Sequence, residues 1–212
     1  MALISSVTHS AYELALWKME ESEDELQSIT SIHSIPAILS IHRRLEYLSV
    51  RAAALTLGIK PNEITYLESG KPILSDPKKH ISISHTKGYA AVAISQIDLM
   101  GIDIEYKSER VLKIRNRFLH QEEDQWIKEQ SPNKIIENQY LQLYWCAKEA
   151  LFKALPFDGI DFKTELRICN FKLETTKGHF YAKEARFNQA FQLDYLIEND
   201  YTLTCGFLKG SK

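Results

Sequence analysis

The sequence predicts an α+β fold made of two similar subdomains, each a helix packed on a mainly antiparallel sheet. The order of strand, helix and further strands occurs twice along the chain, although no residue-level repeat accompanies it. A chain of 212 residues is long enough for two fused small domains, at roughly 150 residues per domain. We expect subdomains at residues 1–98 and 99–212 that act as one functional unit.

In the first half, hydrophobic periodicity predicts a strand, a short helix, a long helix and three strands. Residues 11–17 alternate like a strand, and Ser22 followed by Glu25 has the spacing of a capping box. Pro36 is expected to begin the long helix, and Gly58 to end it. The three strands are expected to form an antiparallel group at residues 63–67, 79–84 and 89–95.

The second half opens with a predicted strand at residues 101–105 and continues with helices. A charged helical stretch is expected at about residues 110–129, followed by a helix at residues 134–155. The remaining strands are expected at residues 167–173, 178–182, 190–198 and 201–208.

Composition narrows the classes of partner. The 26 basic and 28 acidic side chains give a formal charge of -2, so no global positive field is available to hold nucleic acid or an anionic membrane. We expect neither partner, and the absence of a basic leader or a long apolar run predicts a cytoplasmic protein. The three cysteines fit neither a disulfide framework nor a zinc-ligand pattern.

Two carboxylates, Asp103 and Glu105, lie two residues apart in a β-branched run and therefore project from one face of the predicted strand. Adjacent like charges cost free energy unless a cation or solvent relieves them, and oxygen ligands suit Mg²⁺. The alternative is an ordinary solvated strand face.

Glu149 and Lys153 share one face of the last predicted helix. Taken alone, they fit an ordinary ion pair at four-residue spacing. Ser84 and His85 end a predicted strand in a turn and could meet a phosphate or base edge, or be solvated turn residues. The sequence has no Gly-x-Ser-x-Gly elbow, phosphate-binding P-loop or dinucleotide fingerprint, so a phosphate would be held by a metal, lysines and scattered amides.

The order of these motifs is more informative than any one of them. The motifs follow one another as Gly70-Lys71-Pro72, Ser84-His85, Gly101-Ile102-Asp103-Ile104-Glu105 and Trp145-x-x-Lys148-Glu149-x-x-x-Lys153. This series resembles the 4'-phosphopantetheinyl transferase superfamily, in its long, surfactin-synthetase-activating type. The resemblance implies a pseudo-dimer of α+β halves with the active site at their junction.

The resemblance also implies a set of site residues. Asp103, Glu105 and Glu149 would hold Mg²⁺, which would grip the pyrophosphate of the co-substrate coenzyme A. Lys148 and Lys153 would meet phosphate oxygens, with Lys153 neutralising the departing phosphate. The nucleotide side of the cleft would be lined by Lys71, Ser84 and His85.

The implied reaction is attack by a carrier-protein serine on the β-phosphorus of coenzyme A, with release of 3',5'-ADP. The serine proton needs an acceptor, for which Glu123 and Glu149 are the two candidates. Glu123 lies where the family has a proposed catalytic glutamate, and its alternative is a solvated helix face.

One departure from the family pattern concerns the 3'-phosphate of coenzyme A. Family members often carry basic residues just ahead of the first long helix, yet residues 19–41 contain no Lys or Arg. Four basic residues on the helix remain as candidates: His42, Arg43, Arg44 and Arg51.

The expected partners are coenzyme A and an apo acyl or peptidyl carrier protein, with the enzyme itself a monomer. Carrier proteins are usually acidic, and the basic stretch from Lys107 to Arg117 is one candidate docking patch. The alternatives are an inactive coenzyme A-binding module, a Mg²⁺-dependent phosphohydrolase and a protein-interaction domain.

Overall fold

A computed structural model describes residues 3–35, 40–97, 99–157, 159–173 and 175–209. The chain forms two compact units, Met1–Asp98 and Leu99–Lys212. Each contains helices and an antiparallel sheet, so the predicted α+β fold class is confirmed.

The first unit is built on a four-stranded sheet in the order β1-β2-β6-β5, with every neighbouring pair antiparallel. Its strands are β1 (Leu3–Thr8), β2 (Glu13–Lys18), β5 (His80–Thr86) and β6 (Tyr89–Ser95). Strand β1 was not predicted, because most of its residues are polar or exposed and it lacks a clear apolar alternation.

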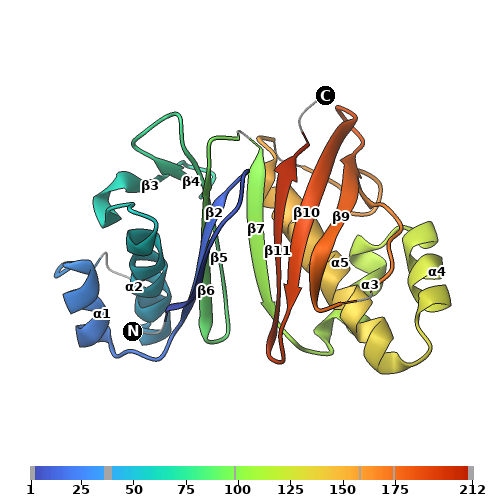
Figure 1. Cartoon of the computed structure of the whole chain (residues 1–212), viewed down its shortest axis with the longest axis horizontal. Coiled ribbons are helices and arrows are strands. Elements are labelled where there is room, and N and C mark those ends of the chain that lie inside the picture. Colours follow the sequence, from blue (N-terminus) through green and yellow to red (C-terminus); the bar gives the residue numbers. More distant parts are fainter. Residues whose placement is uncertain (1–2, 36–39, 98, 158, 174, 210–212) are drawn as a thin grey trace. The chain divides into compact units, whose positions relative to one another are not determined.

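Two helices accompany this sheet, and Figure 1 shows the longer one lying along a face of it. Helix α1 (Glu23–Thr30) begins at Ser22 with the predicted capping box. Helix α2 (Ile41–Thr56) begins at Ser40, whose side chain accepts a hydrogen bond from the Arg43 backbone N–H. The predicted start at Pro36 lies outside the described residues.

A smaller element follows α2. After a short 3-10 turn (Pro61–Glu63), β3 (Ile64–Tyr66) pairs with β4 (Pro72–Leu74) to form a separate two-stranded sheet. The turn between them contains Gly70 at φ +82°, a conformation that glycine adopts without steric cost. The prediction of one antiparallel group is therefore correct for β5 and β6 but not for β3.

The second unit is built on a five-stranded antiparallel sheet in the order β7-β11-β10-β9-β8. Its strands are β7 (Met100–Tyr106), β8 (Leu166–Ile168), β9 (Lys177–Glu184), β10 (Gln189–Ile197) and β11 (Tyr201–Leu208). Helix α5 (Lys134–Ala154) packs on β7 and β11, as Figure 1 shows.

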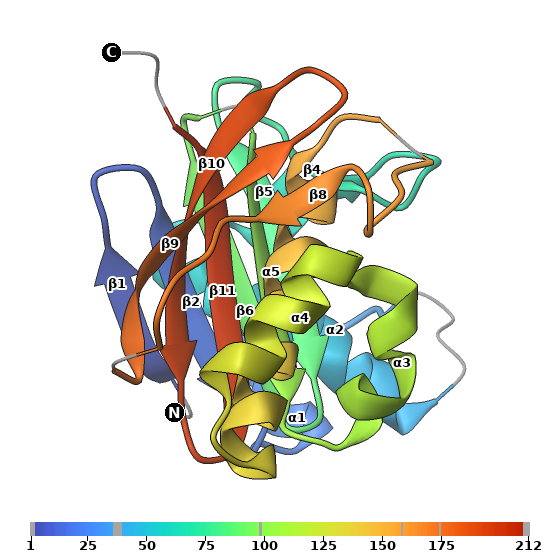
Figure 2. The same ribbon diagram turned by 90° about the vertical axis from the view of Figure 1, so that its right-hand side faces the viewer.

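The charged stretch at residues 110–129 is two helices rather than one. Helix α3 (Arg110–Phe118) ends before Leu119, which is extended, and α4 (Gln121–Gln130) begins with His120 as its N-cap. His120 and Glu123 form a reciprocal capping box, so this local signal interrupts the helix. Both helices contact α5 (Figure 2).

Gly101 sets the distance between β7 and α5. A Cβ atom at this position would lie 2.1 Å from the carbonyl oxygen of Ala150 and 2.7 Å from the backbone nitrogen of Ala154. Both neighbours are backbone atoms of α5, so they cannot move without moving the helix. Glycine therefore allows the strand and the helix that carry the candidate carboxylates to lie in direct contact.

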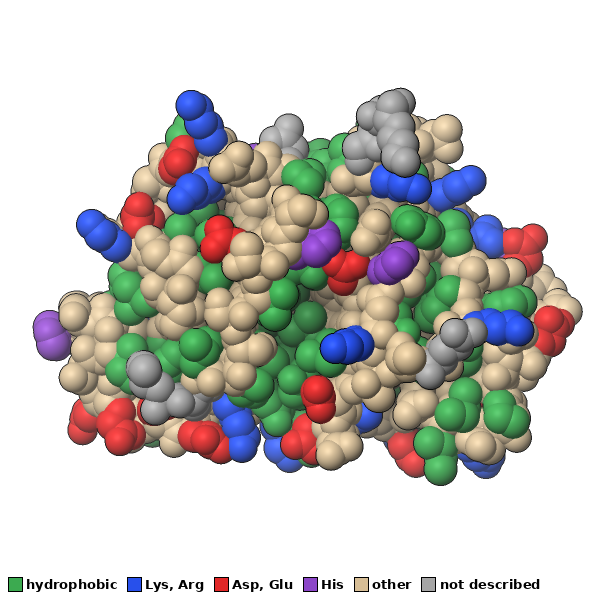
Figure 3. All heavy atoms as spheres, viewed as in Figure 1, with side chains coloured by type: hydrophobic (Ala, Val, Ile, Leu, Met, Phe, Trp, Pro, Cys, Tyr) green, Lys and Arg blue, Asp and Glu red, His purple; other side chains and the backbone are tan. Residues whose placement is uncertain are grey.

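Charged side chains of both signs are interspersed over the face drawn in Figure 3, in keeping with the near-neutral composition. Within the described residues, no helix is long and apolar enough to cross a membrane.

Candidate active site

The paired carboxylates of β7 are more enclosed than a solvated strand face would be. Ile102 and Ile104 are buried on one side of the strand, and Asp103 on the other side is only 4% exposed. Glu105 is partly buried at the end of the strand. The solvated alternative is therefore wrong for Asp103, whose charge has to be balanced by nearby groups.

Helix α5 brings Glu149 and Lys153 to this part of the strand. The Lys153 ammonium donates a hydrogen bond to Oδ1 of Asp103 at 2.7 Å. The contact joins the helix to the strand, so the Lys153 ammonium pairs with a residue outside its own helix. Asp103 is nearly buried and Lys153 only partly exposed, which strengthens the pair relative to a surface ion pair.

The carboxylates are close enough to affect one another's ionisation. Burial raises the pKa of Glu149 to about 7, with a further contribution from the negative charge of Asp103. Burial and the charge of Asp103 also raise the pKa of Glu105. Such mutual repulsion is the electrostatic situation that a bound cation relieves.

Trp145 fixes one of these carboxylates. Its indole Nε1–H donates a hydrogen bond to Oε1 of Glu105 at 2.7 Å, which opposes the rise in the Glu105 pKa. The indole also packs edge-on against Phe118. Trp145, held by its packing against Phe118, thus orients the Glu105 carboxylate. The sequence motif did not reveal this role.

The donor set fits a magnesium ion chemically, because Asp103, Glu105 and Glu149 offer only oxygen ligands. Across the residues that the structure describes, however, no group of three or more His, Cys, Asp or Glu side chains is already arranged to hold a metal. Instead, the ammonium of Lys153 neutralises Asp103. A cation bound by Asp103 through Oδ1 would therefore have to displace this contact.

Lys148 does not have the position that a phosphate ligand requires. It is fully buried, and its ammonium donates three hydrogen bonds, to Glu123 Oε2 at 2.6 Å and to the carbonyls of Phe118 and Phe162 at 2.8 Å. All three donors of the ammonium are therefore used inside the protein. The expected contact between Lys148 and a phosphate is corrected to a structural role in this unit.

Glu123 is likewise a structural residue in this arrangement. Besides Lys148, its Oε2 accepts from the backbone N–H of His120 at 2.9 Å, and its Oε1 accepts from that of Ile168 at 2.8 Å. It is 2% exposed, so neither the solvated-face alternative nor an approach by a serine hydroxyl fits. Glu123 is therefore not placed to act as the base, and Glu149 remains the candidate acceptor of the serine proton.

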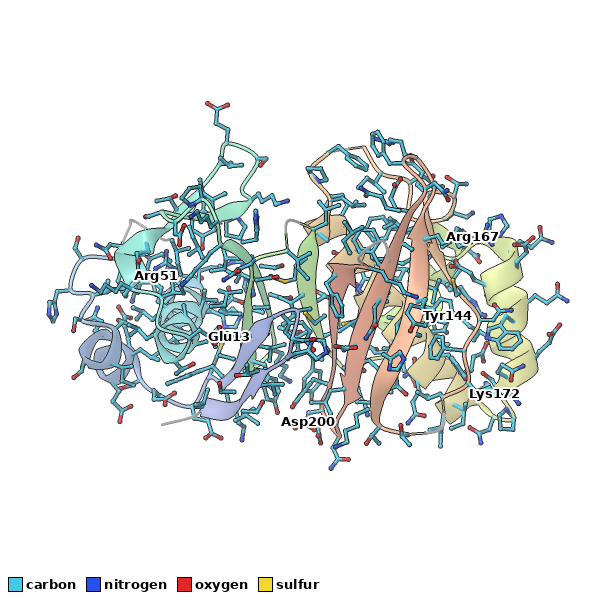
Figure 4. All side chains as sticks on the ribbon, turned by 45° about the horizontal axis from the view of Figure 1, so that its top comes forward. Glu13, Arg51, Tyr144, Arg167, Lys172 and Asp200 are labelled. Carbon is cyan, nitrogen blue, oxygen red and sulfur yellow. The ribbon has the colours of Figure 1, made fainter. Side chains whose placement is uncertain are left out.

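The first unit has a basic cavity of its own, with a volume of about 310 Å³. Arg43, Glu46 and Arg51 of α2 line it together with His85 of β5. Arg51, labelled in Figure 4, is almost completely buried, and its guanidinium lies 3.3 Å over the centroid of the Tyr47 ring. Two of the predicted nucleotide-binding residues, His85 and Arg51, are therefore brought together.

The other predicted nucleotide-binding residues of this unit are placed differently. Arg44 forms an ion pair with Glu23 of α1, and the cavity is lined instead by the preceding residue, Arg43, together with Arg51. Ser84 is buried in β5 and alternates with His85, which places it on the opposite face of the strand. Lys71 is half-buried, which lowers the pKa of its ammonium, and its neighbours Gly70 and Pro72 line the cavity.

Glu46 was not predicted as a site residue, although its spacing from two basic residues on the same helix indicated that they would be in contact. It lies three residues after Arg43 and four after His42 on a predicted helix, the spacing at which side chains meet. In the structure both basic side chains contact its carboxylate.

The chain is a mixed α+β protein, and in its second unit β7 and α5 bring three carboxylates and a lysine close together. The family model described as the 4'-phosphopantetheinyl transferase superfamily matches residues 99–206, which contain every member of that cluster. The chain therefore belongs to the 4'-phosphopantetheinyl transferase superfamily, and the predicted membership is confirmed.

Two curated relatives are consistent with this assignment. The chain is 36% identical over 88 residues to the 4'-phosphopantetheinyl transferase gsp of Aneurinibacillus migulanus, a match that covers 42% of this chain and only 35% of the relative. It is 25% identical over 186 residues to the 4'-phosphopantetheinyl transferase HetI of Nostoc sp., covering 78% of this chain and 77% of the relative.

Proposed function

We propose that this protein transfers the 4'-phosphopantetheine group of coenzyme A to a serine of an apo acyl or peptidyl carrier protein. The observation that carries the proposal is the contact between β7 and α5, which gathers Asp103, Glu105, Glu149 and Lys153 in a member of this superfamily. The names of both relatives support the same activity.

Asp103, Glu105 and Glu149 would hold Mg²⁺ in this proposal. Their oxygen-only donors and the raised pKa values of Glu105 and Glu149 support a cation in this place. When bound, the ion supplies Lewis-acid stabilisation of negative charge on the phosphate oxygens. Trp145 keeps the Glu105 carboxylate in a fixed orientation, which reduces the reorganisation needed on binding.

The transfer itself exchanges one P–O bond for another. The carrier serine oxygen forms a bond to the β-phosphorus of coenzyme A, the bond from that phosphorus to the bridging oxygen breaks, and 3',5'-ADP leaves with the electron pair. The serine proton passes to a base, for which Glu149 is the remaining candidate because Glu123 is buried and hydrogen-bonded within the protein. Lys153, released from Asp103, neutralises charge on the leaving phosphate.

The nucleotide part of coenzyme A is assigned to the basic cavity of the first unit, with Arg43, Arg51 and His85 in its lining. For the carrier protein, α3 presents exposed basic side chains at Arg110, Lys113 and Arg117. Arg115 belongs to the same helix but is engaged with Asp124 and Glu137. The proposed docking surface therefore comprises the three exposed residues without Arg115.

The test is intact-protein mass spectrometry of an apo carrier protein incubated with this protein, coenzyme A and Mg²⁺. We expect the carrier to gain one phosphopantetheine, and we expect EDTA to prevent the gain. The Asp103→Asn protein should give no product, because the substitution removes a proposed metal ligand while keeping the shape of the side chain. Asp194→Asn is the matched control, since it changes a partly buried aspartate on β10 of the same sheet.

Other outcomes would support different functions. Release of 3',5'-ADP without a carrier protein would indicate a phosphohydrolase. Binding of coenzyme A without transfer to any acyl or peptidyl carrier protein would indicate a binding module. Full activity of the Asp103→Asn protein would contradict the proposed site.

A further inference from the structure

The basic cavity of the first unit contains a buried carboxylate among basic side chains. Glu46 is 7% exposed, and its Oε1 lies 3.1 Å from His42 Nε2 and 3.2 Å from His85 Nδ1. Its Oε2 accepts a hydrogen bond from the Arg43 guanidinium at 3.0 Å. One acidic side chain on α2 thus connects two neighbours on its own helix with a residue on β5.

The basic partners of Glu46 are far more exposed than Glu46 itself. Arg43 is 62% exposed as a side chain, His42 64% and His85 36%. An exposed arginine or histidine normally samples many rotamers, and fixing it in one costs conformational entropy. A shared, buried acceptor fixes all three without adding a further mobile charge.

The cavity lining also contains a buried arginine, Arg51. Arg51 is only 3% exposed, and its Nε lacks a hydrogen-bond partner among the described residues. One of its terminal nitrogens donates to the carbonyl of Tyr47, so the guanidinium is held in place. A fixed guanidinium in the lining places a positive charge beside the cavity, which favours an anionic ligand.

The cation-rich lining favours an anion, yet Glu46 itself repels one. A carboxylate beside a phosphate site lowers affinity by direct electrostatics, so its presence needs a compensating effect. Ordering the basic side chains is such an effect, because binding then requires less loss of side-chain entropy.

We propose that Glu46 is a positioning residue that holds Arg43 and His85 ready to bind a phosphate monoester. The inference rests on the proposed function, in which this group is the 3'-phosphate of coenzyme A. A phosphate monoester carries up to two negative charges and three terminal oxygens, enough to bind several donors at once. Arg43 and His85 supply donors from exposed side chains, and Arg51 contributes a fixed positive charge from the buried part of the lining.

The charge and the positioning effect of Glu46 predict opposite results for the Glu46→Gln substitution. Removing the negative charge alone should strengthen phosphate binding. Replacing one of the two carboxylate oxygens with an amide NH2 group leaves a single acceptor, which can no longer hold Arg43 and the two histidines together, and this should weaken binding. The sign of the change in affinity therefore distinguishes a positioning residue from a carboxylate that merely opposes the ligand.

The experiment is isothermal titration calorimetry of the full chain with coenzyme A and with 3'-dephospho-coenzyme A, both in the presence of Mg²⁺. These ligands differ only in the phosphate monoester. We expect Glu46→Gln to weaken coenzyme A binding about tenfold, the order expected when one or two side chains must be immobilised on binding. Binding of the dephospho ligand should be unchanged.

Glu13→Gln is the matched control, because it makes the same chemical change at an exposed position on β2 that does not line this cavity. It should leave both affinities as in the wild type. Unfolding in urea checks that each variant is folded. If Glu46→Gln does not fold, Arg43→Gln replaces it, since Arg43 is exposed and should lose the preference for coenzyme A in the same way.

Each outcome decides a separate point. Equal or tighter binding of coenzyme A by a folded Glu46→Gln protein would overturn the positioning role alone. Equal affinity of the wild type for the two ligands would show that the cavity does not bind the phosphate monoester, and would overturn this inference while leaving transfer open. Failure of the wild type to bind either ligand would overturn both the proposed function and the inference about Glu46.

Discussion

The buried pair of Lys148 and Glu123 makes a prediction that separates folding from catalysis. The Glu123→Gln substitution leaves Lys148 fully buried with its carboxylate partner replaced by a neutral amide. Removing one partner of a buried ion pair costs about 3–5 kcal/mol, because an uncompensated charge remains in the interior. We therefore expect a loss of this order in the free energy of unfolding.

The loss should depend on pH in a defined direction. Burial lowers the pKa of Lys148 from 10.5 to about 8 even with Glu123 beside it, and Glu123 opposes this lowering. In the Glu123→Gln protein the pKa of Lys148 therefore falls below about 8, and the folded variant releases its proton at a lower pH than the wild type. At pH values between the Lys148 pKa of the variant and that of the wild type, the folded variant binds fewer protons than the folded wild type. The difference between their free energies of unfolding therefore shrinks as pH rises.

The assay is equilibrium unfolding in urea at pH 6 and pH 9, followed by circular dichroism. The destabilisation by Glu123→Gln should be larger at pH 6 than at pH 9. Glu122→Gln is the matched control, because Glu122 is the adjacent residue on the same helix but its side chain is 76% exposed. It should have little effect at either pH.

A transfer assay under conditions where both variants remain folded completes the test. A Glu123→Gln protein of unchanged stability but without activity would refute the structural role and return Glu123 to the position of catalytic base. A destabilised protein that retains transfer at low temperature would support the structural role.

Three further predictions concern the second unit. Gly101→Val should destabilise the protein by about 1–3 kcal/mol or more, because the side chain meets the α5 backbone, and an unchanged urea midpoint would contradict this contact. The Mg²⁺ concentration that gives half-maximal transfer should fall as pH rises from 6 to 8, since metal-free Glu149, with a pKa of about 7, must lose its proton to bind a cation. A Mg²⁺ concentration that stays constant over this pH range would argue against Glu149 as a metal ligand. Lys153→Ala should reduce kcat more than the affinity for coenzyme A, and calorimetry beside steady-state kinetics would show an equal loss in both if Lys153 only binds the substrate.

Local sequence signals determined much of the fold. The capping box at Ser22 and Glu25, and the strands at residues 89–95 and 201–208, could be predicted because they depend on neighbouring residues and on simple periodicity. The edge strand β1 and the short strand β4 were not predicted, since their residues are largely exposed or show no clear apolar alternation. Strand β3 was predicted at residues 63–67, but its pairing with β4 was not.

The sequence predicted a set of candidate site residues, but it did not distinguish the surroundings of each one. The order of the motifs placed Asp103, Glu105, Glu149 and Lys153 in one family, and the family match includes all four. The same motif grouped Lys148 with Lys153, although one is fully buried and the other is paired with Asp103. The motif does not distinguish these two lysines, although residues five positions apart on a helix point in different directions.

The sequence by itself determined the family and the α+β class, because these follow from residue order and local pattern. Only the tertiary structure decided that Lys148 and Glu123 satisfy each other in the interior, and that Glu46 connects α2 with His85 on β5. The physical reason is that burial and hydrogen-bond partners depend on contacts between residues far apart in the chain. Those contacts fix the local dielectric and the available donors, and therefore decide whether a charged side chain supports the fold or remains available to a ligand.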